Sequence, residues 1–235
     1  MSRWFSWLRS ERGSTAAEFA LVLPAALLLI FGVFDGGRYM WSMNRLEKAV
    51  QMGTRTAVVT GIVPVGLNSY DFTGKGLTCP VPDGSGGTVN KTIQAGDTIC
   101  ASALGTITCT MASAGSDASC TCVPTTQGAN SCPTTGTPDA TATNRFNRIL
   151  SRMRVVDPSL QPGEVTITYS GSGLGYAGDP AVDDSGAALS DAAPIVTVSV
   201  NRASVRAMLL LGGRIPLPGF HYSQTMEDGD GQVSY

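Results

Sequence analysis

Glu18 is the side chain in this sequence whose position most strongly indicates a chemical role. It lies five residues after Gly13, near the start of the only apolar segment of membrane-spanning length, and Phe19 follows it directly. A carboxylate costs roughly 2.5–3.5 kcal/mol at the centre of a bilayer and less near the end of a span. Because that cost opposes a charge at this position, we expect a function to require Glu18.

The apolar segment itself predicts a membrane span. Residues 19–34 form an uncharged run of sixteen residues, and small flanking residues extend it to the roughly 20 that a bilayer requires. Three arginines within residues 3–12 precede it. Because basic residues stay on the cytoplasmic side, we predict a transmembrane segment at about residues 16–37, with the N-terminus inside and the remaining chain outside.

A cleaved secretory signal peptide is the competing interpretation of the same segment. It would need a cleavage site after the apolar core, in which two small residues are separated by one residue of any kind. Residues 32–35 read Gly-Val-Phe-Asp, in which large side chains occupy the required positions. The sequence therefore favours a retained helix, with the signal peptide as the alternative.

Three residues within the span bear on how the helix packs. Pro24 removes one backbone hydrogen bond, which produces a bend or a point where the helix can loosen. Gly32 and Gly36 are four residues apart and would let two helices approach closely. These three residues are candidates for helix packing during assembly, together with Glu18.

The helix is predicted to continue beyond the membrane. Apolar residues recur at the spacing of one helix face as far as Ala57, and Gly61 and Pro64 then provide a stop. We therefore predict one helix over residues 14–60, about 70 Å long at 1.5 Å per residue. Its first half is apolar on all sides, whereas its second half is amphipathic and suited to carry a globular domain.

Six cysteines fall within one 54-residue stretch that is poor in core-forming residues. An even number of clustered cysteines indicates a disulfide framework and hence an oxidising compartment. A zinc site is disfavoured, because the sequence contains no pair of cysteines with the CxxC spacing of zinc knuckles. Six cysteines allow 15 pairings, which the sequence does not distinguish. The candidates are Cys79, Cys100, Cys109, Cys120, Cys122 and Cys132.

This cysteine-rich stretch belongs to a longer segment, residues 61–143, that is rich in Gly, Thr and Ser. Residues 74–142 contain no aromatic side chain, and such a composition buries little apolar surface. We interpret the segment as a surface insertion held by disulfides, with short strands such as one near residues 107–110. It is either a recognition surface or a variable decoration.

Residues 144–235 are predicted to complete a small α+β domain. A helix capped by Asn144 and ending at Asp157 has an apolar stripe on one face and three arginines on the other. The fold class is therefore α+β, with the distal half of the long helix packed on a small antiparallel sheet.

The strands of that sheet are predicted from alternating patterns in the same segment. Residues 165–169 and 195–200 alternate apolar and polar side chains, and residues 220–226 are a third candidate. The strongly apolar residues 205–211 predict a short helix that closes the core.

Charge and composition argue against several function classes. The net charge is −2, and removal of residues 1–13 would leave 13 basic and 17 acidic side chains, a net charge of −4. We therefore expect no nucleic-acid partner. His221 is the single histidine and has no nucleophile motif nearby, so we expect no enzyme, no cofactor and no metal site. The acidic loops do not fit the twelve-residue calcium-binding pattern.

The N-terminal region resembles the TadE-like family of tight-adherence (Tad) pilus and secretion systems, a branch of the type IV pilus machinery. The family usually has glutamate where this chain has Asp35. The resemblance covers residues 12–57. It rests on Arg12-Gly13-Ser14, on residues 17–24 from Ala17-Glu18-Phe19 to Pro24, on Phe31-Gly32, on Asp35-Gly36-Gly37-Arg38 and on residues 49–57.

The resemblance implies a pseudopilin or minor pilin in the bacterial inner membrane. A prepilin peptidase would cut after Gly13, and Ser14 would become the new N-terminus, with Glu18 as the fifth mature residue. Glu18 would serve peptidase recognition or would pair with the amine of a neighbouring subunit. The implied partners are the peptidase, other pilins of the system, the inner-membrane assembly platform and membrane lipid. The alternative is a membrane-tethered exported domain for binding or adhesion that never enters a fibre.

Overall fold

The computed structural model describes residues 14–133, 139–180, 186, 189–202, 204–207 and 213–226. The chain forms two compact units. Unit 1 comprises Met1–Asn44 and Ala203–Leu217, and unit 2 comprises Arg45–Arg202 and Pro218–Tyr235. The predicted leader, including Gly13, lies outside the described residues.

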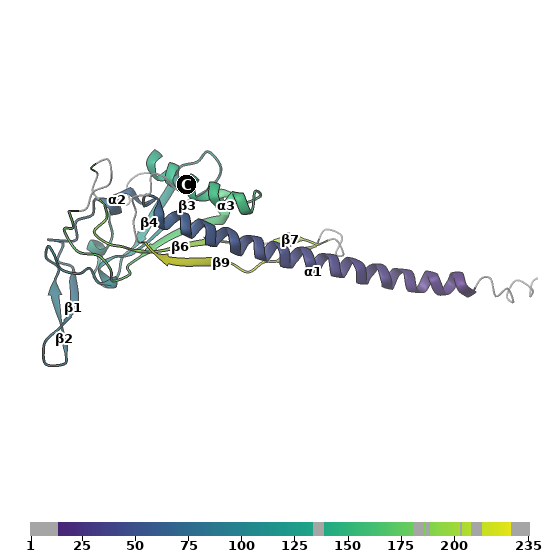
Figure 1. Ribbon diagram of the computed structural model, residues 1–235, viewed down its shortest axis with the longest axis horizontal. Helices are drawn as coiled ribbons and strands as arrows, with labels where there is room; N and C mark the ends of the chain where they lie inside the picture. The colour runs from purple at the N-terminus through teal and green to yellow at the C-terminus, as the bar shows by residue number, and fades with distance from the viewer. Residues whose placement is uncertain are drawn as a thin grey trace, which may run out of the picture. The chain divides into compact units, whose positions relative to one another are not determined.

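The predicted long helix is confirmed. Helix α1 (Ser14–Val59) is continuous and contributes residues to both units (Figure 1). Within unit 2, its buried residues recur at the three- and four-residue spacing of one helix face, while Glu47, Lys48 and Arg55 are exposed. The buried face includes Leu46, Ala49, Val50, Gly53 and Ala57, and Thr54, Thr56 and Val58 beside it are buried as well.

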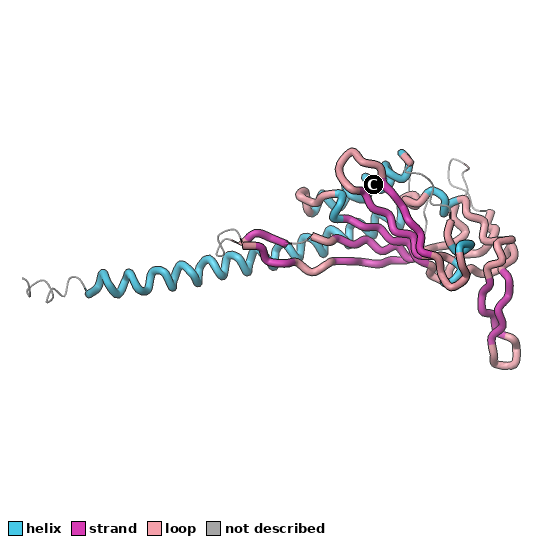
Figure 2. Tube along the Cα trace, turned by 180° about the vertical axis from the view of Figure 1, so that it is seen from behind, coloured by secondary structure: helices cyan, strands magenta, loops and turns pink. Residues whose placement is uncertain are grey.

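Unit 2 is built on a five-stranded antiparallel sheet with the strand order β4-β3-β5-β6-β9 (Figure 2). The three strands predicted in the C-terminal segment are all present in it. The strands are β3 (Thr106–Met111), β4 (Ala118–Val123), β5 (Val165–Ser170), β6 (Ile195–Val200) and β9 (Phe220–Thr225).

One face of this sheet is apolar and buried. In β5, Val165, Ile167 and Tyr169 are buried, and the residues between them are half-buried. The register places these three side chains opposite the buried valines of β6. The opposite face carries mainly hydroxyl side chains, such as those of Thr168 and Thr197, which pair across β5 and β6.

Two helices cover the apolar face, so the core lies between two layers. Helix α3 (Ala140–Val156) packs beside the unit 2 part of α1. A Cβ added at Gly53 of α1 would lie 2.7 Å from Met153 Sδ and 3.3 Å from Val198 Cγ1. A residue without a side chain therefore permits α1, α3 and β6 to meet at this point. This arrangement confirms the predicted α+β class.

Helix α3 begins earlier than predicted. Asp139 is its N-cap, and the Asp139 carboxylate accepts a hydrogen bond from the Thr141 N–H at 3.0 Å. The predicted cap, Asn144, lies inside the helix. Aspartate and asparagine cap helices equally well, and the alanines at positions 140 and 142 are strong helix formers that extend the helix back to Asp139.

Residues 205–211 were predicted to form a helix, and this prediction is wrong for residues 205–207, which the structure describes. Strand β7 (Ser204–Arg206) pairs with strand β8 (Arg214–Pro216) in unit 1, and Val205 lies opposite Ile215. Two β-branched side chains facing each other favour a strand pair over a helix. Residues 208–212 lie outside the described residues.

The interpretation of the cysteine-rich segment as a surface insertion also needs correction. Its strands β3 and β4 belong to the main sheet, where β3 lies between β4 and β5 and buries Ile107 and Met111. Only its β1–β2 hairpin (Thr78–Pro82 and Thr88–Thr92) forms a sheet of its own, and every residue of β2 is exposed. The short helices are α2 (Val65–Asn68), η3 (Ala101–Ala103), η4 (Ala129–Ser131) and η5 (Pro162–Glu164).

A buried carboxylate organises one end of unit 2. Asp157, the C-cap of α3, is 2% exposed, and its Oδ1 accepts a hydrogen bond from Arg45 Nη2 at 2.6 Å. Arg202 Nη1 donates to Asp157 Oδ2 at 2.8 Å, and Arg202 Nε donates to Glu164 Oε1 at 2.9 Å. Ser159 Oγ also donates to Asp157 Oδ1, at 2.6 Å. One carboxylate thus joins α1, α3 and the segment that follows β6.

These contacts lower the pKa of both carboxyl groups. Burial alone raises the pKa of Asp157, but the hydrogen bond from Ser159 and the charges of Arg202 and Arg45 outweigh it. Burial also raises the pKa of Glu164, and its hydrogen bonds and the Arg202 charge again prevail. Because the folded-state pKa is lowered, the two carboxylates stabilise the fold at pH values above their unfolded-state pKa of about 4. This stabilisation is lost as the pH falls through the folded-state values.

The substitution Asp157→Asn tests this cluster. It leaves two arginines without their shared anion, and we expect a loss of unfolding free energy at the lower end of about 3–5 kcal/mol. The variant should also lose less stability than the wild type as the pH falls below about 4. Urea denaturation in detergent solution between pH 3 and pH 7 measures both effects.

A matched control uses the exposed ion pair between Lys91 and Asp97, whose charged atoms are 2.7 Å apart. Asp97→Asn should lower the unfolding free energy far less than Asp157→Asn does, because solvent screens the exposed pair. Equal losses in the two variants would show that the buried cluster is not special.

The structure pairs all six cysteines as disulfides, which confirms the predicted framework. The bonds are Cys79–Cys100, Cys109–Cys120 and Cys122–Cys132. The Cys109–Cys120 bond links two residues that are directly opposite in the β3–β4 register.

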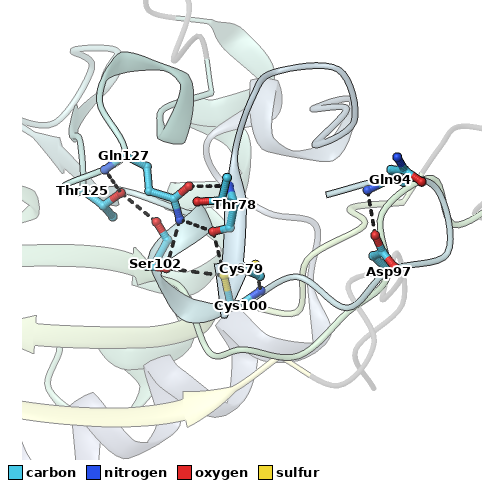
Figure 3. The surroundings of a disulfide bond; sticks show 8 residues. All are labelled: Thr78, Cys79, Gln94, Asp97, Cys100, Ser102, Thr125 and Gln127. Carbon is cyan, nitrogen blue, oxygen red and sulfur yellow. Dashed lines mark hydrogen bonds between the residues drawn. A yellow bond between two sulfur atoms is a disulfide. The ribbon is translucent and has the colours of Figure 1, made fainter. Parts of the chain in front are cut away.

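The Cys79–Cys100 bond lies beside a polar network that holds β1 (Figure 3). The Thr78 N–H donates to Gln127 Oε1 at 2.7 Å, and Gln127 Nε2 donates to the Thr78 carbonyl at 2.8 Å. Gln127 Nε2 also donates to Ser102 Oγ at 3.0 Å. The Gln127 side chain therefore pairs with the Thr78 backbone as a neighbouring strand would, and the disulfide and this amide together hold β1 in place.

Non-reducing peptide mapping tests the pairing at its most demanding point. Cys120 and Cys122 are separated by one residue, and the sheet register assigns them to different partners. We expect fragmentation between them to link Cys120 to Cys109 and Cys122 to Cys132, with no free thiols. The exchanged pairing would need a two-residue shift of β4 and would contradict the register. Replacing both Cys79 and Cys100 by serine should remove about 2–4 kcal/mol of stability.

Candidate functional site

The first half of α1 is the candidate functional site. Ser14 is its first residue, and Glu18 lies one turn further along the helix, on the exposed surface with Phe19. A negative charge in the first turns of a helix is favoured by the helix dipole. A cut after Gly13 would therefore place the new amine of Ser14 about one helical turn from the Glu18 carboxylate.

The surface of this half is apolar and uncovered. Phe19 is 65% exposed, Leu21 79% and Leu29 69%. A continuous 18-residue stretch of α1 has no buried residue and is long and apolar enough to cross a membrane. Exposed apolar patches of this size mark contacts with lipid or with other proteins. The helix is thus suited to a membrane anchor.

Of the predicted packing residues, Pro24 and Gly36 are exposed, whereas Gly32 is half-buried. Helix α1 continues through Pro24. A Cβ added at Gly32, Gly36 or Gly37 would meet no atom within 4 Å. The backbone is therefore accessible at the glycines, as close approach of a second helix would require.

The sequence patterns around Asp35 predict no structural role for it. The structure buries it, at 8% exposure, within the helix surface that follows the apolar stretch. Gly32, Tyr39 and Ser42 are half-buried at helical spacing from it, so this side of the helix is partly covered. The three- and four-residue spacing of these small and polar residues is the signal in the sequence that indicates such a face.

The other candidate residues do not form a site in the described part of the chain. His221 lies on β9, is exposed and faces Ser199 across the sheet. Among the described residues, no group of three His, Cys, Asp or Glu side chains is placed to hold a metal ion.

These features of α1 agree with a known family. Residues 13–55 match the TadE-like protein family. The match includes Gly13, Glu18, Pro24, Gly32 and Gly36, and it ends four residues before the end of α1. It implies a pilin-like protein associated with a Tad pilus. No curated protein and no solved structure matches the chain.

Proposed function

We propose that this protein is a pseudopilin or minor pilin of a Tad-type pilus assembly or secretion system. The observation that carries the proposal is that the family match falls on an apolar helix whose exposed half continues directly into the core helix of a folded domain. A fibre subunit needs both parts, one to pack with neighbouring helices and one to carry the exported domain. The role is structural rather than catalytic.

The proposed topology follows from charge and disulfides. The three arginines before α1 keep the N-terminus in the cytoplasm, and the three disulfides of unit 2 need an oxidising compartment outside it. The protein would therefore span the inner membrane once. A prepilin peptidase would remove residues 1–13, and the assembly platform and other pilins would take up the mature helix.

Glu18 has a physical role in this scheme. A free α-amine, such as the one that cleavage would create at Ser14, is largely cationic at neutral pH. A carboxylate on one helix and an amine on its neighbour attract strongly in a surrounding of low dielectric constant, although desolvation cancels much of the gain. The pair would therefore fix the register between subunits more than it would stabilise the fibre.

The N-terminus of the mature chain tests the processing step. In cells that contain the peptidase, mass spectrometry should find a chain that begins at Ser14. Gly13→Leu should leave an uncut chain that begins at Met1, because the bulk of leucine replaces hydrogen at the cleaved position. If the unsubstituted chain also begins at Met1 in these cells, the processing proposal fails.

Glu18→Gln tests the register role, because it removes the charge and keeps the size of the side chain. Loss of a charged hydrogen bond of about 1.5–3 kcal/mol should reduce incorporation into sheared fibres at least about tenfold. Membrane insertion should be unchanged. Immunoblots of fibre and membrane fractions measure both.

Glu47→Gln is the matched control, since Glu47 is an exposed carboxylate on the same helix beyond the predicted span. It should leave incorporation unchanged. The N-terminus of the Glu18→Gln chain separates the two roles of Glu18. An uncut chain would assign the residue to peptidase recognition, and normal incorporation would refute the register role.

A further inference from the structure

Unit 1 contains a small hairpin together with the N-terminal part of α1. Strands β7 and β8 belong to the same compact unit as the helix up to Asn44, and the hairpin lies alongside the helix (Figure 2). Its two strands place Arg206 directly opposite Arg214. Both arginines are exposed.

Two like charges directly opposite each other destabilise a strand pair. Within the described residues, no carboxylate forms an ion pair with Arg206, Arg214 or Arg38. Arg38 is the first residue after the predicted span. Unit 1 thus carries three cations that are not ion-paired with any carboxylate among the described residues, including the buried Asp35 of the same unit. An anion from outside the chain would reduce the repulsion between these cations.

An open groove on α1 lies next to one of these cations. It has a volume of about 300 Å³ and is lined by Val33, Phe34, Gly37, Arg38 and Trp41. Its walls are apolar, and a Cβ added at Gly37 would meet nothing within 4 Å. Trp41 is 60% exposed, and tryptophan is enriched where membrane meets water. An apolar groove beside an arginine suits an acyl chain and its phosphate headgroup.

We propose that Arg38, Trp41, Arg206 and Arg214 form an interfacial collar that binds anionic phospholipid in the outer leaflet of the inner membrane. This inference rests on the proposed membrane span of α1. Each arginine near an anionic membrane surface is attracted to it. The phosphates also screen the repulsion between Arg206 and Arg214, which the described residues leave uncompensated.

Lipid is favoured over a protein partner because the collar is continuous with the proposed span. Arg38 and Trp41 follow directly on the exposed apolar surface of α1, which is long and apolar enough to cross a membrane. Cations next to apolar surface match the chemistry of a phospholipid headgroup above its acyl chains.

Trp41 provides a probe at the collar itself. The other two tryptophans are Trp4 and Trp7, so a full-length chain with Trp4→Phe and Trp7→Phe retains only Trp41. This protein is reconstituted in vesicles of equal parts phosphatidylcholine and phosphatidylglycerol, with one of the two lipids brominated in its acyl chains. We expect brominated phosphatidylglycerol to quench Trp41 more strongly, which corresponds to an enrichment of about threefold near the collar.

The collar variant Arg206→Gln with Arg214→Gln should bring the enrichment close to one. About 1 M NaCl should reduce it as well, because the screening length falls to ~3 Å. The control variant Lys48→Gln with Arg55→Gln removes the same charge from exposed positions of α1 in unit 2 and should keep the enrichment. An unchanged disulfide map verifies that each variant is folded.

The outcomes separate the collar from the proposed function. Equal quenching by the two lipids in the unsubstituted collar overturns the lipid proposal, and so does an equal loss in the control variant. Absence of quenching by either lipid overturns the membrane span, and the collar with it. A collar variant that keeps the lipid preference yet fails to enter fibres assigns these arginines to a neighbouring subunit, which also overturns the lipid proposal.

Discussion

Helix α1 is one continuous helix that has to suit two different surroundings, and the other features of the protein follow from that constraint. Up to Phe34 its large apolar side chains are exposed, which is stable only in lipid or against other helices. From Leu46 onward one face is buried against the sheet and α3, while charged residues occupy the rest. Gly53 then allows α3 and β6 to approach the same helix closely. The change from a helix that is apolar and exposed on all sides to one that is buried on a single face therefore takes place within α1.

The Asp157 cluster fixes the points where the chain enters and leaves unit 2. Arg45 is the first residue of unit 2, and Arg202 is the last one before the chain passes to unit 1. Both bind one buried carboxylate. Such pairs contribute little net stability, because desolvation offsets the attraction. Their geometry is strict, however, since two guanidinium groups and the Ser159 hydroxyl must reach the same two oxygens. The cluster therefore defines where β6 ends relative to α1.

Long, strongly patterned elements were predictable from the sequence, and those that depend on distant partners were not. The apolar run and the stripe that follows it predict α1 almost to the residue, and alternation predicts β5 and β6. Composition alone misjudged the cysteine-rich segment, because Thr and Cys can alternate around a few buried residues such as Ile107 and Met111 and still supply two strands of the main sheet. The cap at Asp139 and the β7–β8 pair were missed for a similar reason. Arg45 and Arg202 are 112 and 45 positions from Asp157 in the sequence, so no local pattern could predict this cluster.

The two ends of the proposed span carry opposite charges. In the proposed scheme Glu18 at the inner end pairs with the amine of a neighbouring subunit, and Arg38, Arg206 and Arg214 at the outer end pair with headgroup phosphates. Moving the apolar surface between them from lipid to neighbouring helices changes its surroundings little, because lipid tails are as apolar as leucine. The charged ends therefore dominate the balance between membrane and fibre. A neighbour's amine would favour the fibre through Glu18, whereas headgroup phosphates would favour the membrane through the arginines. If both proposals hold, the collar would keep the subunit in the membrane until a neighbouring subunit supplies the amine that pairs with Glu18.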